Sequence, residues 1–403
     1  MKILVISHMY PSRKRSVYGI FVHKHIKALI NQGCEVKVVS PVPYVPFPLK
    51  YIKQKWREYD DIPKKDIIEG VEVYYPRYID FPKSLMFGYS GYFMYLGVNN
   101  IIKKIYKDWK FDIIHSHVGL PDGFAGMLAN RHYKLPHIIT IHGQDFQRTI
   151  YKGETCKKNL FKALETSNKI ITVSTKLKNI VDTESFSDRV AVINNGIDLE
   201  DCANIGSKID FGLDHDYDFS DENTILSVSN LVKTKGIDLN IKAVSLLITK
   251  YPNIKYLIIG DGPERESLKN LAYELDLKDN VLFLGKLPHE DVMKYMSATD
   301  IFCLPSWEEG FGVVYIEAMA HGKPTIGVKG EGIEDAIVSG KNGFLVNPHN
   351  EKDVADTIGY LLSNKDKREE IGQKGKDTVI NRFTWEQNAN KTINIYRELL
   401  KSK

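Results

Sequence analysis

Short apolar runs rich in β-branched residues recur along the chain, and each is followed by a segment with helical spacing. The runs are KILVIS, CEVKVVS, VEVYYPR, DIIHSHV, HIITIHG, KIITVS and VAVINNG in the first half, then TILSVS, IKYLIIG, NVLFLG, DIFCLPS, PTIGV and GFLV. Nearly continuous apolar runs are typical of strands covered on both faces, as in parallel sheets with helices on each side. The alternation with helices therefore predicts an α/β protein built from two doubly wound domains.

The length and one polar stretch set the predicted domain boundaries. A chain of 403 residues exceeds one ordinary core, so two domains are expected. The turn-rich stretch from Asp201 to Thr224 separates the two series of strands, and we interpret it as a linker. The predicted domains are residues 1–200 and 201–383. Apolar residues at helical spacing predict that residues 384–403 form a helix that packs back on the first domain; they are Trp385, Ala389, Ile393, Tyr396 and Leu400.

Composition excludes several classes of protein. A formal charge of +4 is small for this length and does not support a nucleic-acid-binding protein. The cysteines have no metal-ligand spacing, so we expect reduced thiols in a cytosolic protein; they are Cys34, Cys156, Cys202 and Cys303. The first residues run straight into a strand with no signal-peptide order, and no apolar run reaches the roughly 18 residues that span a bilayer. We expect a cytoplasmic protein, with peripheral contact at the inner face of the membrane as the one membrane option.

Polar residues gather where the predicted strands end. In parallel sheets, ligands bind outside the carboxyl ends of the strands. Those ends are Ser7-His8, His117, His142-Gly143, Ser174, Ser229-Asn230, Gly260-Asp261-Gly262, Gly285, Ser306 to Gly312, and Lys329-Gly330. Glycine, histidine, serine and acidic residues dominate. Two domains with such edges facing each other would make a polar cleft.

The stretch SWEEGFGVVYIEAMAHGKP, residues 306–324, holds two glutamates around a predicted helix N-terminus. Backbone N–H groups at such an end attract anions. Glu309 precedes the helix, and Glu317 lies roughly 7 Å along it from Gly312. A carboxylate accepts two hydroxyl hydrogen bonds at once and so suits a sugar diol. The pair would span a nucleotide sugar. If the two glutamates are considered without the surrounding residues, the alternative to ligand binding is that Glu309 is solvated and Glu317 is paired with a lysine.

The same stretch resembles the signature of glycosyltransferase family 4, whose members have the GT-B fold of two Rossmann-like domains facing a cleft. The resemblance covers nearly the full chain. Further matching motifs are VINNGID at residues 192–198, IIGDGPERESL, FTWEQNANKTINIY, and TIHGQDF at residues 140–146. The segment GVKGEGIEDAIVSGKNGFLV is similar to the bacterial teichuronic-acid and capsular-polysaccharide branch.

The resemblance implies roles for residues of the second domain. Glu309 would contact hydroxyls of the donor sugar and act in catalysis, Glu317 would bind the nucleotide ribose, and Lys235 would face the diphosphate. Backbone N–H groups toward sugar and phosphate would come from Gly310, Phe311 and Gly312. Asn230 departs from the family pattern, which has arginine there. A neutral hydrogen bond in place of a charge-assisted one could weaken the diphosphate contact about tenfold.

In the first domain, His142 lies in the HG-x-D element of TIHGQDF. The resemblance implies that it bonds the donor sugar and supports charge build-up during transfer, and that Asp145 orients it or binds substrate. Gly19 occupies the family's glycine-rich turn, where backbone approaches the donor phosphate. Arg13 and Arg15, with the lysine between them, would meet an anionic acceptor, or would form an exposed charged loop.

Two segments leave alternatives open. Residues 84–110, SLMFGYSGYFMYLGVNNIIKKIYKDWK, are aromatic and then basic. They form either a helix packed on the first sheet or an interfacial patch for a lipid-linked glycan. The DHDYD motif, with Asp214, Asp216 and Asp218, suggests metal binding only superficially, and we interpret it as solvated linker.

The resemblance implies a retaining glycosyltransferase that moves a sugar from a nucleoside diphosphate sugar to a growing, lipid-linked cell-surface polysaccharide or other glycan. The donor would bind the second domain and the acceptor the first. No cofactor and no metal ion are expected, because amides and cations neutralise the leaving diphosphate. A sugar-nucleotide epimerase of the same fold and a non-catalytic binding subunit of a transferase pair are the alternatives.

Overall fold

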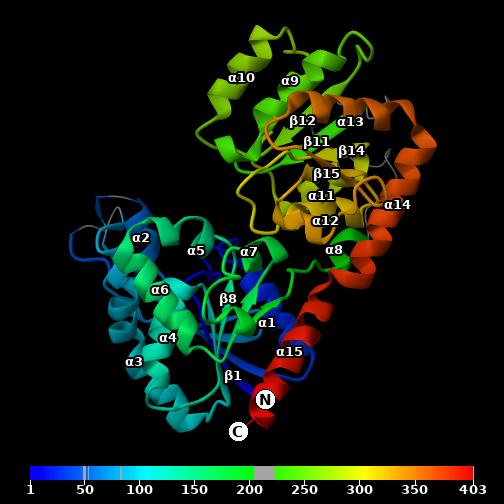
Figure 1. Cartoon of the computed structure of the whole chain (residues 1–403). Helices are drawn as coiled ribbons and strands as arrows, with labels where there is room; N and C mark the ends of the chain where they lie inside the picture. The colour runs from blue at the N-terminus through cyan, green and yellow to red at the C-terminus, as the bar shows by residue number, and fades with distance from the viewer. Residues whose placement is uncertain (49–50, 53, 82–83, 204–222, 403) are drawn as a thin grey trace. The chain divides into compact units, whose positions relative to one another are not determined.

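The computed structural model describes residues 1–48, 51–52, 54–81, 84–203 and 223–402. The chain divides into two compact units (Figure 1). Unit 1 comprises Met1–Asn195 and Trp385–Lys403, and unit 2 comprises Gly196–Thr384. The sequence-based boundaries stand at residues 200 and 383, within five residues of these.

Unit 1 is built on an eight-stranded sheet with the strand order β10-β9-β8-β7-β1-β2-β5-β4. Its strands are β1 (Lys2–Ile6), β2 (Glu35–Val39), β4 (Lys65–Ile68), β5 (Val71–Tyr74), β7 (Ile113–His117), β8 (His137–Ile141), β9 (Lys169–Thr172) and β10 (Val190–Val192). All neighbours are parallel except the edge pair β4–β5. All seven predicted runs form strands. The antiparallel edge strand β4, which is half exposed, was not predicted.

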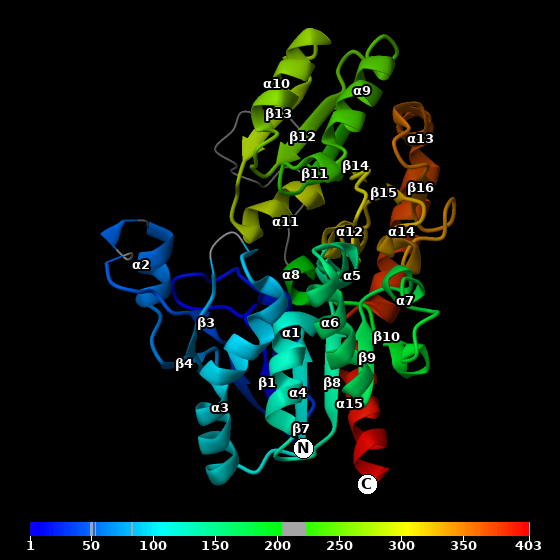
Figure 2. The ribbon, with the colours of Figure 1, turned by 60° about the vertical axis from the view of Figure 1, so that its left-hand side comes forward.

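Helices cover both faces of this sheet (Figure 2). The helices of unit 1 are α1 (Ile20–Asn31), α2 (Gln54–Asp60), α3 (Ser90–Asp108), α4 (Phe124–Asn130), α5 (Gln144–Gln147), α6 (Glu154–Thr166), α7 (Thr175–Asn179) and α15 (Trp385–Lys401). Ile3 and Val5 of β1 pack with α1 and α15, whereas Leu4 and Ile6 pack with α3 and α4. Because both faces are buried, the central strands are mostly apolar on both faces, with buried polar residues such as His115 and Ser116 on β7 as exceptions. A separate two-stranded ladder of β3 (Val42–Pro43) and β6 (Arg77–Tyr78) follows the β2–β5 pair.

Helix α3 confirms the packing interpretation of residues 84–110. Four buried residues at helical spacing join the core on its side of the sheet: Met94, Val98, Ile102 and Ile105. Other apolar side chains of the segment remain exposed, among them Leu85, Tyr89 and Leu96. The segment is therefore amphipathic in the folded protein.

Helix α15 packs within unit 1. Trp385, Ala389, Ile393 and Tyr396 are buried against the core that α1 shares with the sheet. The hydroxyl of Tyr396 lies 2.6 Å from Nδ1 of the buried His115 on β7. The last helix thus covers one face of a sheet whose strands all lie within the first 192 residues.

Unit 2 is built on a six-stranded, wholly parallel sheet with the order β13-β12-β11-β14-β15-β16. Its strands are β11 (Thr224–Val228), β12 (Lys255–Ile259), β13 (Val281–Gly285), β14 (Ile301–Cys303), β15 (Thr325–Val328) and β16 (Phe344–Val346). Its helices are α8 (Glu200–Ala203), α9 (Ile237–Leu247), α10 (Arg265–Glu274), α11 (His289–Ala298), α12 (Val313–Ala320), α13 (Glu351–Ser363) and α14 (Lys365–Arg382). All six predicted runs form strands, so the prediction of two doubly wound α/β domains is confirmed.

The predicted linker begins with α8, and residues 204–222 lie outside the described residues, including Asp214, Asp216 and Asp218. All four cysteines are free thiols, and three of them are buried. Within the described part of the chain, no helix is long and apolar enough to cross a membrane.

We expect Tyr396→Phe to lower the free energy of unfolding by about 1–3 kcal/mol, because it leaves Nδ1 of the buried His115 without its partner. The urea midpoint of the full chain measures the effect. Asn394→Ala, on an exposed position of the same helix, is the control and should leave the midpoint near that of the wild type. Equal stability of Tyr396→Phe and wild type would contradict the buried hydrogen bond.

Candidate functional site

Each parallel sheet has one place where the chain reverses its direction of travel across the sheet. In unit 1 this place is between β1 and β7, and in unit 2 it is between β11 and β14. The connections that leave the two central strands go to opposite sides there, which opens a crevice outside the carboxyl ends. The physics of the fold therefore predicts one binding site per unit, at these two points.

At the switch point of unit 2, Lys235 follows β11 and Glu309 follows β14. The Lys235 Nζ and the Glu309 carboxylate form an ion pair. Ser306 donates its hydroxyl to the same Glu309 oxygen at 3.1 Å. Both members of the pair are mostly buried, with side chains 23% and 17% exposed. Two residues singled out from distant motifs thus lie in direct contact.

A second acid fixes the backbone beside this pair. The Glu309 N–H donates to Glu331 Oε2 at 2.7 Å, and Glu331 is 9% exposed. Gly332 packs so closely on the loop that a Cβ there would lie 2.2 Å from the carbonyl oxygen of Gly310. Sequence reasoning missed Glu331. The available signal was an acid between two glycines, Gly330 and Gly332, shortly after the strand PTIGV.

Helix α12 begins as predicted, directly after Gly312, whose φ of 83° is one that glycine adopts without strain. Phe311 is buried, with its ring stacked 5.8 Å from that of Phe383. Its side chain is therefore a core residue, which leaves its backbone for any ligand. Glu317 lies on α12 near Cys202. Burial, then the charge of Glu317, raises the pKa of that thiol to about 12.

The loop after β11 is packed backbone against backbone. A Cβ at Gly260 would lie 1.8 Å from the carbonyl oxygen of Ser229, and one at Gly262 would lie 2.4 Å from that of Leu231. Asn230 stands between them with an exposed side chain. The position expected to hold arginine in the family thus points a neutral amide toward solvent.

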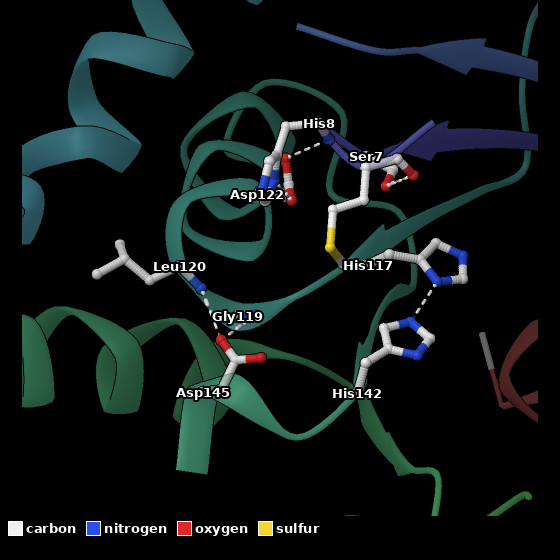
Figure 3. Close-up of polar contacts among 9 residues, drawn as sticks. Ser7, His8, His117, Gly119, Leu120, Asp122, His142 and Asp145 are labelled. Carbon is white, nitrogen blue, oxygen red and sulfur yellow. Dashed lines mark hydrogen bonds and ion pairs between the residues drawn. The ribbon is translucent and has the colours of Figure 1, made fainter. Parts of the chain in front are cut away.

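At the switch point of unit 1, His8 follows β1 and Asp122 follows β7 (Figure 3). His8 Nδ1 lies 2.6 Å from Asp122 Oδ2, and the His8 N–H donates to Oδ1 at 3.0 Å. Burial acts to lower the pKa of His8, but the Asp122 carboxylate outweighs it and holds that pKa above its usual value. With Nδ1 donating, Nε2 is the acceptor nitrogen of the neutral ring.

Sequence reasoning noted His8 at a strand end and missed Asp122 altogether. Asp122 is fully buried and lies 114 residues from its partner. Burial raises the pKa of the Asp122 carboxyl, and the His8 cation opposes that shift. The one signal in the sequence was a Pro-Asp-Gly turn shortly after the strand DIIHSHV.

His142 and Asp145 of the HG-x-D element have different partners (Figure 3). His142 Nε2 lies 3.0 Å from His117 Nδ1, whereas Asp145 Oδ1 accepts the N–H groups of Gly119 and Leu120 at 3.0 and 3.4 Å. The expectation that Asp145 orients His142 is wrong: His117 does so, and Asp145 holds the loop after β7. Burial raises the pKa of Asp145 to about 7.

His142 ends a stack of three imidazoles that runs into the core, with a fourth, His25, set edge-on against it. The rings of His117 and His142 lie 5.3 Å apart, those of His115 and His117 lie 4.6 Å apart, and His25 contacts both His115 and His117 edge-on. Burial lowers the pKa of His25 to about 4 and that of His142 to about 3. The stack is therefore neutral near pH 7. Among the described residues, no group of histidine, cysteine or acid side chains is arranged to hold a metal ion.

The two arginines in the first loop of unit 1 have different interaction partners. Arg13 forms an ion pair with Asp66 at 2.8 Å. The Arg15 guanidinium lies 4.0 Å from the centre of the Tyr18 ring and donates to the Tyr59 hydroxyl at 3.0 Å. Gly19 has a φ of 71°, and a Cβ there would lie 2.3 Å from the backbone of Met9. Close packing of backbone on backbone is thus sufficient to require glycine at this position.

The neutral histidines make unit 1 sensitive to acid. An unfolded histidine binds a proton below its pKa of about 6.5, whereas folded His25 does so only near pH 4. The contribution of these histidines to the free energy of unfolding is therefore fully present above pH 6.5. It falls as the pH drops toward 4, by up to about 1.4 kcal/mol per pH unit for each such group.

We expect His25→Leu to lose less stability than wild type between pH 6.5 and 4, because one proton fewer is taken up on unfolding. Urea midpoints across this range measure the difference in slope. The raised pKa values of His8 and Asp145 act in the opposite direction in both proteins, so they cancel in the comparison. His132→Gln, at an exposed histidine, is the control. Parallel slopes for all three proteins would show that His25 does not resist protonation.

Comparisons with known proteins agree with this architecture. Residues 19–201 match the model described as glycosyltransferase family 4, and residues 215–378 match that described as glycosyl transferases group 1. Two uncharacterized glycosyltransferases of Methanocaldococcus jannaschii are 31% and 30% identical. The matches cover 77% and 98% of this chain and 82% and 98% of those proteins. A Bacillus subtilis protein named as a teichuronic acid biosynthesis glycosyltransferase, TuaC, is 26% identical over the full length of both chains.

Solved structures share the fold. Sucrose-phosphate synthase from Thermosynechococcus elongatus aligns over the whole of both chains with a TM-score of 0.80 at 20% identity. The Anabaena protein HepE, solved in complex with UDP, aligns over 99% of this chain and 100% of its own with a TM-score of 0.73 at 18% identity. The chain therefore belongs to the GT-B glycosyltransferases of family 4, and it is an enzyme that transfers glycosyl groups.

Proposed function

We propose that this enzyme transfers a sugar, with retention of anomeric configuration, from a nucleoside diphosphate sugar to a growing, lipid-linked cell-surface glycan. The observation that carries the proposal is the Lys235–Glu309 ion pair at the switch point of unit 2, beside the N-terminus of α12. A cation for phosphate and a carboxylate for hydroxyls are the two groups that such a donor requires at one place.

The donor half of the proposal assigns each part of this site to one part of the donor. Lys235 has three N–H donors, so it can bond a diphosphate oxygen while it keeps Glu309. The backbone N–H groups of residues 310–312 stand at the start of α12, where the helix dipole favours negative charge. Glu309 takes the sugar hydroxyls, and Glu317, further along α12, takes the ribose. Asn230 adds a neutral hydrogen bond to the diphosphate.

Relatives support the choice of donor and product. HepE has been solved with UDP and with UDP-glucose, which makes uridine nucleotides the first to test here. The name of TuaC refers to teichuronic acid biosynthesis, which supports a polymer of the cell envelope as the product.

The second half of the proposal assigns unit 1 to the acceptor and to one contact with the transferred sugar. His142 keeps a buried Nδ1 without a partner, and we assign this nitrogen to a hydroxyl of the sugar being transferred. Exposed apolar and aromatic side chains of the segment before and along α3 suit peripheral contact with the cytoplasmic face of a membrane, where a lipid-linked acceptor is found. They are Leu85, Met86, Tyr89, Tyr92 and Leu96.

We expect Glu317→Ala to weaken binding of the bare nucleotide by about tenfold or more, because a ribose diol loses two hydrogen bonds to a charged acceptor. Glu309→Ala should instead retain nucleotide affinity and lose turnover. Calorimetric titration with UDP, GDP and ADP, followed by measurement of donor consumption, separates the two roles.

The outcomes of this titration distinguish the alternatives. Selective binding of one nucleotide, lost in Glu317→Ala, supports the donor site. Equal affinity of wild type and Glu317→Ala for every nucleotide would remove the ribose role. Conversion of the donor into a second sugar nucleotide would favour the epimerase, and binding with no turnover on any acceptor would contradict the transferase assignment.

We further propose that transfer needs no metal ion, because Lys235 and the amides before α12 neutralise the leaving diphosphate. Donor turnover should be unchanged by excess EDTA. Complete loss of turnover in EDTA, restored by Mg²⁺ or Mn²⁺, would contradict this and direct attention to Asp214, Asp216 and Asp218.

A further inference from the structure

Unit 1 contains a cavity of about 390 Å³ over the carboxyl ends of β1, β2 and β7. His8 lies on its wall, so the cavity adjoins the switch point of the sheet. Aromatic rings form much of the lining, among them Tyr18, Trp56, Tyr59, Tyr78, Phe81 and Phe87. Its volume lies in the range of small-molecule sites, and its lining combines these aromatic rings with many hydroxyl and charged groups.

Two buried hydroxyls in this lining have no partner. Ser12 is 4% exposed and Ser90 is 5% exposed, and the Oγ of each lacks a hydrogen bond. Buried polar atoms are rarely left unsatisfied, so each such hydroxyl points to a ligand or solvent group that completes it. Nδ1 of His8 is taken by Asp122, which leaves Nε2 of the same ring to bond a hydroxyl. These groups suit a ligand rich in hydroxyls, which is a sugar.

Arg15 adds a charge to this lining. The Tyr18 ring and the Tyr59 hydroxyl hold its guanidinium in place, and no carboxylate in the described part of the chain forms an ion pair with it. Asp80 also lines the cavity, but this carboxylate already takes part in another interaction. A guanidinium fixed by tyrosines and lacking an acid presents parallel N–H donors that match a carboxylate or phosphate. Arg13, two residues earlier, is already neutralised by Asp66.

We propose that this cavity binds a sugar unit of the acceptor that carries an oxyanion, either a carboxylate or a phosphate, and that Arg15 recognises that group. The proposal rests on the proposed function, since it identifies the chemical class of the acceptor. Aromatic rings receive the apolar faces of the sugar ring, the serine hydroxyls and His8 bond its hydroxyls, and Arg15 selects charged over neutral acceptors.

The test measures binding of three probes to the full chain by ligand-observed NMR: D-glucuronate, D-glucose 6-phosphate and D-glucose. Wild type should bind at least one of the two anionic sugars more tightly than glucose, and the tighter one identifies carboxylate or phosphate as the group recognised. Arg15→Gln should lose about tenfold or more of that affinity and leave glucose binding unchanged. Arg13→Gln is the matched control and should behave as wild type.

Two results would overturn the proposal. One is equal binding of glucose and both anionic sugars to wild type, a comparison that needs no variant. The other is an equal loss of anion binding in Arg13→Gln and Arg15→Gln, which would indicate general surface charge. Arg15→Lys guards against misfolding, because it keeps the charge without the fork and should bind with intermediate affinity.

Nucleotide titration on the same samples separates this inference from the proposed function. Arg15→Gln should bind nucleotide as wild type does, because the side chains assigned to the diphosphate and the ribose, Lys235 and Glu317, lie in unit 2. Arg15-dependent binding of an anionic sugar without any nucleotide binding would contradict the proposed donor and keep the cavity as an anionic-sugar site. Nucleotide binding with no preference for anionic sugars would contradict only the inference.

Discussion

The reversal of strand order in the middle of each parallel sheet is the constraint on which both sites depend. The two strands on either side of it send their chains in opposite directions, so no connection covers their carboxyl ends. Each unit places an acid and a base there, from loops more than 70 residues apart: Lys235 with Glu309, and His8 with Asp122. A covered sheet edge would require apolar residues at these positions. An open one allows charged groups there, of which Lys235, Glu309 and His8 remain partly accessible while Asp122 is fully buried.

The two pairs differ in what surrounds them, and this decides their chemistry. In unit 1, burial suppresses protonation of the four clustered histidines, while Asp122, more than any other group, keeps the pKa of His8 above its usual value. One histidine of the cluster around this edge therefore takes up a proton readily and the others do not. A hydroxyl that meets His8 finds a ring whose tautomer is fixed by a buried carboxylate. This is the condition for a directional hydrogen bond.

The sequence alone predicts what local pattern controls. Thirteen apolar runs became strands, α12 begins directly after Gly312, and α15 packs by the spacing of its apolar residues. Partners brought together from distant loops were missed, namely Asp122 and Glu331, because nothing near them in the chain indicates which group they meet. The expectation that Asp145 orients His142 was wrong for the same reason. Arg13 and Arg15 look alike in sequence and differ only through Asp66 and Tyr59, some 50 residues away.

The ion pair of unit 2 also carries an energetic consequence for ligand binding. Lys235 and Glu309 are mostly buried, and separating them without a replacement partner would leave two partly desolvated charges uncompensated, which costs free energy. A ligand that displaced Glu309 from Lys235 would have to offset that cost. A ligand that placed an anion at the free N–H donors of Lys235 and hydroxyls at the free lone pairs of Glu309 would leave the pair intact and would not incur that cost. A molecule with phosphate and sugar at adjacent positions therefore fits the pair as it stands, whereas phosphate alone satisfies only one side of it.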